Sequence, residues 1–405
     1  MSTPTRAASS TEHVGDLPLT TRHANLGDLA TILKDQQARK VDVVAPAPSI
    51  RSEHGTWIVK GAEPELTADG VTDTDGRYRP TAVADEGMAE KLGIPRAYLR
   101  RLRDERPDLY DANVNGWLHG FGHDRGIGGV IADPPGRVEP DPRSFLVRAF
   151  RVNGEGVARA LLSDRYRIVD HLDVLTAALD GIRSSGADVH VESCDLTERR
   201  MYVRFAAPAV RELAPDLLGD YRSPFTGDRG ADNPVVFAGF VLSNSETGAG
   251  AFTLTPRLTI EVCKNGMTVN ADALRNVHLG GKLDEGVIRW SDETQQRNLE
   301  LVTSQARDAV ATFLDPAYVR AKLDEIRADA GKPIDDPAGT VKRVASGLRL
   351  AAHTDDLLDH FIRGGDTTAG GMMQAVTSFA QTVEDADEAA EIEGQALDAL
   401  ALAAR

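Results

Sequence analysis

Residues 145–152 read Phe-Leu-Val-Arg-Ala-Phe-Arg-Val, an alternating stretch that is rich in aromatic and β-branched side chains. This pattern is typical of a β-strand, and residues 156–162 are predicted to form a second strand that pairs with it. Further strands are expected at 189–191, 201–205, 235–242 and 251–262. Because the connections between these strands are short, we expect a largely antiparallel sheet. The sequence therefore predicts the α+β fold class, with one central sheet in a domain over residues 141–290.

A helix is predicted between the second and third of these strands. Its apolar side chains recur at helical spacing, at Leu172, Leu175, Leu179 and Ile182. Gly186 follows the helix, where a left-handed cap suits glycine. We expect this helix to pack on one face of the central sheet, with Leu175 and Leu179 buried.

The sequence before the central sheet divides into two parts. Residues 1–24 are rich in Ser, Thr, Ala and Pro and lack periodicity, so a disordered leader is expected. Residues 25–140 are predicted to form an N-terminal α/β segment, in which residues 84–119 are helical.

The helical stretch contains a pattern that is found in DNA-binding proteins. Residues 89–99 superficially resemble a helix-turn-helix, and Arg100, Arg101 and Arg103 follow it. Short motif matches of this kind often arise by chance. The sequence therefore favours a plain helical hairpin with a solvated basic face.

The remainder of the chain is predicted to be helical over residues 291–383. Apolar residues spaced three and four apart form a seam that suits packing on another helix: Leu299, Val302, Ala306, Ala309 and Phe313. We expect later helices of the same chain to cover this seam, with a second subunit as the alternative. Residues 384–405 are expected to form an acidic helix or tail, because residues 384–398 hold seven acids and no base.

The net charge of the 405-residue chain is −16, but this charge is unevenly distributed. Residues 291–405 carry 11 basic and 21 acidic side chains, whereas residues 141–290 carry 18 basic and 20 acidic ones. A uniformly acidic protein would be repelled by nucleic acid and by anionic membranes. The nearly neutral middle of the chain leaves room for a local basic surface.

Several classes of protein are excluded by the motifs and residues that the sequence lacks. Two cysteines, Cys194 and Cys263, are too few for a disulfide scaffold or a cysteine-rich zinc module. No Walker loop and no Gly-x-Ser-x-Gly elbow occur. His119 and His123 have metal-like spacing, but two glycines lie between them and no third ligand is evident. We therefore predict no metal, no cofactor and no catalytic residue.

The sequence also predicts a cytoplasmic protein without a membrane partner. Apolar runs such as residues 235–238 are far too short to cross a bilayer. Residues 1–6 lack the apolar core of a secretory signal. The low cysteine count is compatible with a reducing compartment.

The first of three polar clusters spans residues 162–170, at a predicted turn from a strand to a helix. Arg165 and Arg167 can bind phosphate oxygens as forked donors, and Tyr166 can stack on a base. The alternative is a buried ion-pair network that fixes the turn, and the sequence slightly favours this alternative.

Two more polar clusters follow along the chain. In residues 239–251, a strand enters a polar turn that contains Asn244, Ser245 and Glu246. This turn is interpreted either as a functional loop on a rigid sheet or as a connection held by side-chain-to-backbone hydrogen bonds. Residues 262–267 contain an Asn-Gly turn signal and Lys264, which can contact an anion.

At these three clusters the sequence resembles a family of bacterial phage/plasmid-like proteins, the domain of unknown function 932. The blocks Ser-Asp-Arg-Tyr-Arg at 163–167, Ser-Asn-Ser-Glu at 243–246 and Cys-Lys-Asn-Gly-Met at 263–267 occur in the family's order. Blocks at 92–98, 113–118 and 373–377 fit as well, and the resemblance spans roughly residues 80–385, which is most of the chain. The chain departs from the family at Gln374 and Ser378, where an asparagine and an aromatic residue are frequent.

The resemblance implies a protein of a phage, plasmid or integrated element, and it carries over no catalytic residue. Our first hypothesis is therefore a non-enzymatic accessory protein that binds single-stranded DNA or a DNA-processing protein bound to DNA, in replication or recombination. One alternative is an enzyme with a pocket around Asp164, Asp170, Asn244 and Glu246, suited to acid–base or Mg²⁺-assisted chemistry. Another is an anti-defence interaction protein whose acidic C-terminal part mimics DNA.

These hypotheses make different structural demands. Binding of single-stranded DNA needs a contiguous basic groove, the enzyme needs carboxylates that converge in a pocket, and a DNA mimic needs a regular acidic face. The sequence leaves the oligomeric state open.

Overall fold

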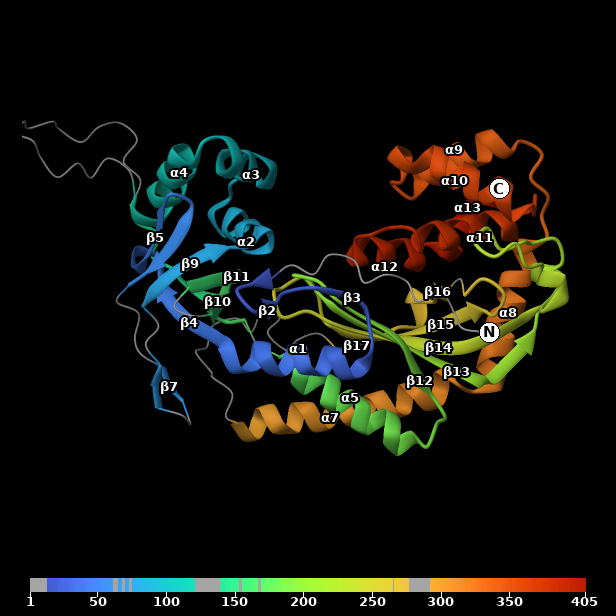
Figure 1. Cartoon of the computed structure of the whole chain (residues 1–405), viewed down its shortest axis with the longest axis horizontal. Helices are drawn as coiled ribbons and strands as arrows, with labels where there is room; N and C mark the ends of the chain where they lie inside the picture. Colours follow the sequence, from blue (N-terminus) through green and yellow to red (C-terminus); the bar gives the residue numbers. More distant parts are fainter. Residues whose placement is uncertain are drawn as a thin grey trace, which may run out of the picture.

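The computed structural model of the protein describes residues 13–60, 65–67, 70–72, 75–120, 139–152, 155–166, 169–264, 266–276 and 292–405. These residues form two main β-sheets with helices packed on them, followed by a group of C-terminal helices (Figure 1). The predicted α+β fold class is confirmed. Within the described ranges, no helix is both long and apolar enough to cross a membrane.

The first sheet has six strands in the spatial order β4-β10-β11-β9-β6-β5 and lies at the left of Figure 1. Its strands are β4 (Lys40–Pro46), β5 (Ile50–Glu53), β6 (Thr56–Val59), β9 (Gly76–Pro80), β10 (Ser144–Val152) and β11 (Glu155–Ser163). Three helices pack on this sheet: α2 (Ala82–Leu92), α3 (Arg96–Glu105) and α4 (Pro107–His119). The short strands β7 (Glu65–Thr67) and β8 (Gly70–Thr72) form a separate hairpin.

The second sheet has seven antiparallel strands in the order β16-β15-β14-β13-β12-β3, with β17 also paired to β15. The strands are β3 (Thr21–Ala24), β12 (His190–Leu196), β13 (Met201–Leu213), β14 (Val235–Asn244), β15 (Phe252–Ile260), β16 (Gly266–Thr268) and β17 (Leu274–Asn276). Along β13, Val203 and Phe205 enter the hydrophobic core, whereas Tyr202 and Arg204 line a cavity. Because side chains alternate between the faces of a strand, the sheet has one apolar and one polar face.

The apolar face is covered by α1 (Leu26–Arg39), α5 (His171–Ser185) and α7 (Asp292–Phe313), which lie along the bottom of Figure 1. The predicted packing of α5 is confirmed, and Leu175 is buried in this core. Leu179, which we expected to be buried as well, is half-buried and packs against the core. α5 and α7 approach closely at Gly181, where an added Cβ would lie 2.3 Å from the backbone oxygen of Thr303. The seam on α7 is thus covered within the chain, mainly by the earlier helix α5. Of the later helices that we expected, α8 contributes Tyr318, whose ring centre lies 6.1 Å from that of Phe313.

The prediction of one central sheet is wrong. β10 and β11 pair with each other, but β10 also pairs with β4 and β11 with β9, so both strands belong to the first sheet. Phe145, Val147 and Ala149 of β10 are buried there in the core that α2, α3 and α4 complete. The expected domain border at residue 141 therefore separates strands of one sheet from each other.

The expected disordered leader is also wrong for the part of it that the structure describes. β1 (His13–Val14) and β2 (Leu17–Pro18) form a small hairpin, and β3 is an edge strand of the second sheet. Val14, Leu17 and Leu19 supply the physical reason, because they are buried against apolar side chains of β10 and β11. Residues 1–12 lie outside the described residues.

After α7 the chain forms further helices that pack largely on one another: α8 (Pro316–Ala330), α9 (Pro337–Gly347), α10 (Thr354–Gly364), α11 (Ala369–Ala380), α12 (Ala386–Gly394) and α13 (Ala396–Ala403). A short helix, α6 (Pro215–Leu218), follows β13. Residues 384–405 are not a tail, because Ala396, Ala399 and Leu400 of α13 are buried in the core. α12 lies on the side of the second sheet opposite α5 and α7 (Figure 1).

Candidate functional site: a buried junction and an open groove

Two polar regions of the protein are candidates for function. The first, the junction, is a largely buried cluster of charges where the two sheets meet: Lys40, Asp42, Arg148, Arg159, Asp170 and Glu246. The second, the groove, is an open cavity on the polar face of the second sheet.

Arg148 of β10 lies at the centre of the junction and is fully buried. Its guanidinium group donates to both carboxylate oxygens of Asp42, at 2.8 and 3.0 Å, and to Asp170 Oδ1 at 2.7 Å. It also donates to the backbone oxygen of Glu246 at 2.9 Å. One buried arginine thus binds three acidic residues from different parts of the chain.

Two further cations balance the charge of the junction. Lys40 Nζ lies 2.5 Å from Asp170 Oδ2, and Arg159 Nη2 lies 2.6 Å from Glu246 Oε2. Lys40 and Arg159 belong to the first sheet, whereas Asp170 precedes α5 and Glu246 lies in the connection between β14 and β15. The junction therefore ties the first sheet to the elements of the second.

The protonation states in the junction follow from burial and from the neighbouring charges. Burial alone would raise the pKa values of Asp170 and Glu246. The charges of Arg148 and Lys40 outweigh burial at Asp170, and those of protonated His171, Arg159 and Arg148 outweigh it at Glu246, so both pKa values lie below their usual range. The backbone N–H of His171 also donates to Glu246 Oε1. Complete burial lowers the pKa of the His171 imidazole to about 4, so this ring is neutral at neutral pH.

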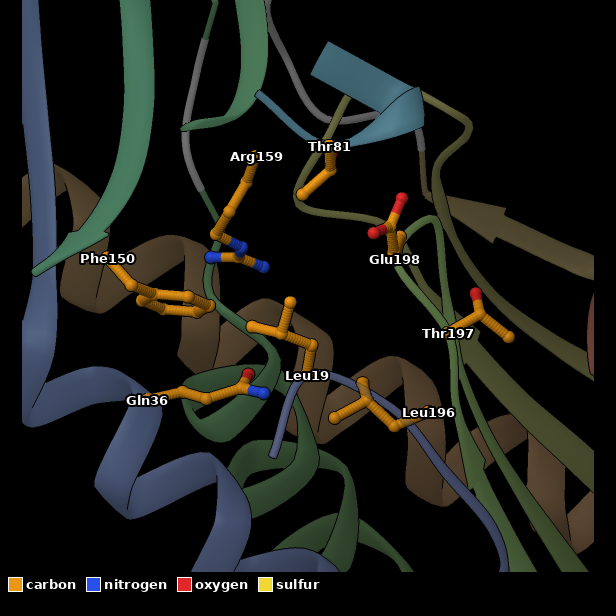
Figure 2. A pocket seen from close by; sticks show the side chains of 8 residues that line it. All are labelled: Leu19, Gln36, Thr81, Phe150, Arg159, Leu196, Thr197 and Glu198. Atoms are coloured by element: carbon orange, nitrogen blue, oxygen red, sulfur yellow. The ribbon is translucent and has the colours of Figure 1, made fainter. Parts of the chain in front are cut away.

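Two small cavities border the junction, each with a volume of about 10 Å³. One of them is shown in Figure 2, where the Arg159 guanidinium lies beside the Phe150 ring and Gln36 faces the same space. The guanidinium carbon of Arg159 is 4.2 Å from the centre of that ring. A cavity of this volume holds about one water molecule, which leaves no room for a substrate.

Three of the four residues of the predicted enzyme pocket do come together in or beside the junction. Asp170 and Glu246 belong to it, and Asn244 Nδ2 lies 3.0 Å from His171 Nδ1 beside them. Asp164 is exposed and does not take part in these contacts. Because the two junction carboxylates are buried and bound by cations, the geometry does not favour a general base at this position.

The groove lies between α12 and the connection from β14 to β15. Its main cavity has a volume of about 720 Å³, and an adjoining cavity of about 390 Å³ extends it towards α2. Both cavities are lined by Arg199 and Ala249. Hydroxyl groups from the polar face of the sheet form much of the floor: Ser243, Thr253, Thr255 and Thr268.

The charge that lines the groove is positive, although the chain as a whole carries −16. Seven basic side chains line the two cavities: Lys91, Arg96, Arg165, Arg199, Arg200, Arg204 and Arg275. Five acidic side chains line them as well: Glu86, Glu90, Asp387, Glu391 and Glu393. A cleft with an excess of one charge concentrates ligands of the opposite charge.

Part of this positive charge has no acidic partner among the residues that the structure describes. Arg199 pairs with Glu86 at 2.6 Å, but Arg165, Arg200 and Arg275 have no carboxylate partner within the described ranges. Arg165 and Arg275 are exposed, and Arg200 donates to the backbone oxygen of Ala249. These three guanidinium groups are therefore available to an anionic ligand.

The residues predicted to bind nucleic acid lie in different surroundings. Arg165 lines the groove, whereas Lys264 lies outside it and pairs with Glu261 at 2.8 Å. The ring of Tyr166 packs against a small apolar cluster, and burial raises the pKa of its hydroxyl. Arg167 lies outside the described residues. The structure thus places Arg165 at the groove and gives Tyr166 a largely packing role.

The predicted polar loop is part of the protein interior. Asn244, Ser245 and Glu246 are all buried. Ser245 Oγ accepts backbone hydrogen bonds from Thr247 at 3.3 Å and from Ala249 at 3.0 Å. These contacts match the interpretation as a fixed connection between strands, and they hold one wall of the groove in place.

α2 and α3 form a helical hairpin, in which Gly93 provides the left-handed cap at φ 68°. The basic face of α3 is paired with acids: Arg100 lies 3.2 Å from Glu86, and Arg101 lies 2.9 Å from Glu105. This pairing favours the plain hairpin over a helix-turn-helix that reads DNA.

Of the two histidines with metal-like spacing, the structure describes His119 alone. His119 Nε2 lies 2.8 Å from the backbone oxygen of Ile50, and His123 lies outside the described residues. In the part of the chain that the structure describes, no group of three His, Cys, Asp or Glu side chains is arranged to hold a metal ion.

Sequence reasoning missed the residues that organise both regions. Arg148 interrupts the apolar pattern of residues 145–152, and a charged residue at an inward position of a strand is a signal for a buried partner. Arg200 and Arg275 stand in sequences without a recognisable motif, so no local signal distinguishes them from ordinary surface arginines.

Comparisons of this chain with models of protein families, with curated proteins and with solved structures give no match. The resemblance to the phage/plasmid-like family therefore stays a prediction, and the functional argument rests on the geometry.

Proposed function

We propose that the protein binds a single-stranded nucleic acid in the groove, through contacts between arginines and phosphates. The observation that carries this proposal is that Arg165, Arg200 and Arg275 line one groove without carboxylate partners among the described residues. Guanidinium groups match the geometry of phosphate oxygens. Phosphate contacts supply most of the affinity of proteins that bind nucleic acid without sequence preference.

The shape of the groove supports a single strand over a duplex. Its floor is recessed between α12 on one side and residues 249–251 on the other. A flexible single strand can follow such a recess, whereas a duplex stays stiff over about 50 nm. The hydroxyl groups of Ser243, Thr253 and Thr255 add hydrogen-bonding partners for sugar and phosphate oxygens.

The family resemblance extends this proposal to a biological setting. It implies a protein of a phage, plasmid or integrated element. In that setting we propose that the protein acts on single-stranded DNA, or with a DNA-processing partner, in replication or recombination. The groove supplies the binding site that such a role needs, and no second function is favoured by a specific observation.

The proposal is tested by the fluorescence anisotropy of a labelled single-stranded oligonucleotide, with a duplex of the same sequence in parallel. The double variant Arg165→Ala/Arg275→Ala removes two proposed phosphate contacts without removing an ion pair between described residues. At about 0.1 M salt, the counterions released by two phosphate contacts raise the affinity for a single strand roughly 25-fold. We therefore expect the double variant to bind the strand about 25-fold more weakly.

The matched control is Arg79→Ala/Arg211→Ala. Both of these arginines are exposed, neither pairs with a carboxylate among the residues that the structure describes, and neither lines the groove. The control loses the same charge and should keep nearly wild-type affinity. Equal losses in the two double variants, tighter binding of the duplex, or no binding by the wild type would each contradict the proposal.

A further inference from the structure

α12 presents an acidic face to the groove. Asp387, Ala390 and Glu391 line the main cavity, and their spacing of three and four residues places them on one face of the helix. Glu393, near the end of the helix, lines the same cavity. The most acidic part of the sequence is thus folded against the proposed binding site.

Two of these carboxylates already bind polar groups of the groove and its floor. The hydroxyl of Tyr202 donates to Asp387 Oδ1 at 2.8 Å. Glu393 Oε2 lies 3.4 Å from Arg204 Nε, and Glu393 Oε1 lies 3.6 Å from Arg257 Nη2. A phosphate oxygen would make the same kinds of contact with guanidinium and hydroxyl groups.

α12 is anchored by few apolar side chains. Its buried apolar residues are Ala386, Ala389 and Ile392, and the helix has nine residues. Isolated helices shorter than about 12–15 residues are marginal in water. The position of α12 therefore depends in part on the contacts of its carboxylates with the floor of the groove.

We infer that α12 is a built-in competitor for the groove, whose carboxylates occupy groups that the phosphates of a bound strand would contact. This inference rests on the proposed function. Arg165, Arg200 and Arg275 stay open for the first encounter with a strand, whereas the region of Arg204 becomes accessible when α12 moves away. The acidic C-terminal part would then limit strand affinity and would favour strands long enough to displace it.

The test compares strand affinity between variants of α12. Asp387→Asn/Glu391→Gln removes two negative charges from the groove and keeps the size of both side chains. We expect strand binding to tighten by roughly two- to fivefold for each charge removed, the range that exposed charge pairs support. The readout is the anisotropy of a labelled single strand in low salt.

The control is Glu388→Gln on the same helix, which removes one negative charge outside the groove. Glu388 is exposed, lies 3.6 Å from His353 and does not line the groove. Its substitution should leave affinity unchanged. If Asp387→Asn/Glu391→Gln binds a strand as the control does, while Arg165→Ala/Arg275→Ala still weakens binding, then α12 does not compete for the groove and the proposed function stands. If no variant binds a strand at all, both fail.

A second measurement detects the movement of α12 itself. Hydrogen exchange of the amides in residues 386–394 should become faster when a saturating single strand is added, because a displaced helix loses protection. Slower or unchanged exchange in α12 at saturation would show that a bound strand does not displace this helix.

Discussion

The junction and the groove are built from the same kinds of residue, but their surroundings differ. Arg148 in the junction is fully buried and binds Asp42, Asp170 and Glu246, whereas Arg275 in the groove is exposed and has no carboxylate partner in the described ranges. A buried charge without a partner is strongly destabilising, so a buried arginine must be paired. An exposed arginine is solvated by water and can stay unpaired.

This difference separates charges that hold the fold from charges that can bind a ligand. The junction has equal numbers of acids and bases and bordering cavities of about 10 Å³, so it acts as a fixed link between the two sheets. The groove has an excess of bases and a main cavity of about 720 Å³. Variants of the two regions should therefore differ in stability and in their response to acid and salt.

Substitution of the central arginine should have the largest effect on stability. Arg148→Met leaves three acidic residues without their shared cation and should lower the free energy of unfolding by about 3–5 kcal/mol. Arg275→Met should change it by no more than about 0.5 kcal/mol. Urea unfolding of the two variants measures both values. Similar effects of the two substitutions would remove the proposed distinction.

Acid should weaken the junction in two stages. The pKa of His171 is about 4 in the folded protein and near 6.5 in the unfolded chain, so the unfolded chain takes up the proton first. The free energy of unfolding is therefore fully retained above pH 6.5 and decreases as the pH falls towards 4, by about 3 kcal/mol in total. Glu246 and Asp170, whose pKa values are lowered, add a further loss below their unfolded pKa values.

Urea unfolding at a series of pH values checks this dependence. His171→Gln should flatten the profile between pH 6.5 and 4, since the variant has no imidazole to protonate in that window. A wild-type stability that is constant over the same window would show that His171 is not held neutral by burial.

The sequence predicted local structure well where the signal is local. The alternating pattern of 145–152 and the helical spacing of Leu172, Leu175, Leu179 and Ile182 both correspond to elements of the structure. The fold class followed from these patterns. The polar clusters at 162–170 and 239–251 were also recognised as important, and Asp170 and Glu246 do meet.

The rest depends on contacts between distant parts of the chain. β10 joins the first sheet because it pairs with β4, about a hundred positions earlier, and no local pattern specifies that partner. Arg148 binds Asp42 across 106 positions and Glu246 across 98. Arg165 shows the converse. The sequence places Asp164 and Asp170 near it as possible partners, but in the fold Asp170 pairs with Lys40 and Arg148 instead.

If the groove arginines contact phosphates, strand binding must release counterions and weaken as salt is added. Affinity for a labelled single strand is measured over about 50–200 mM salt for the wild type, Arg165→Ala/Arg275→Ala and Arg79→Ala/Arg211→Ala. Each contact with a single strand contributes about −0.7 to the slope of log affinity against log salt. We expect the groove variant to have a slope flatter by about 1.4 and the control to keep the wild-type slope. A wild-type slope in the groove variant, or wild-type binding that does not depend on salt, would contradict the account.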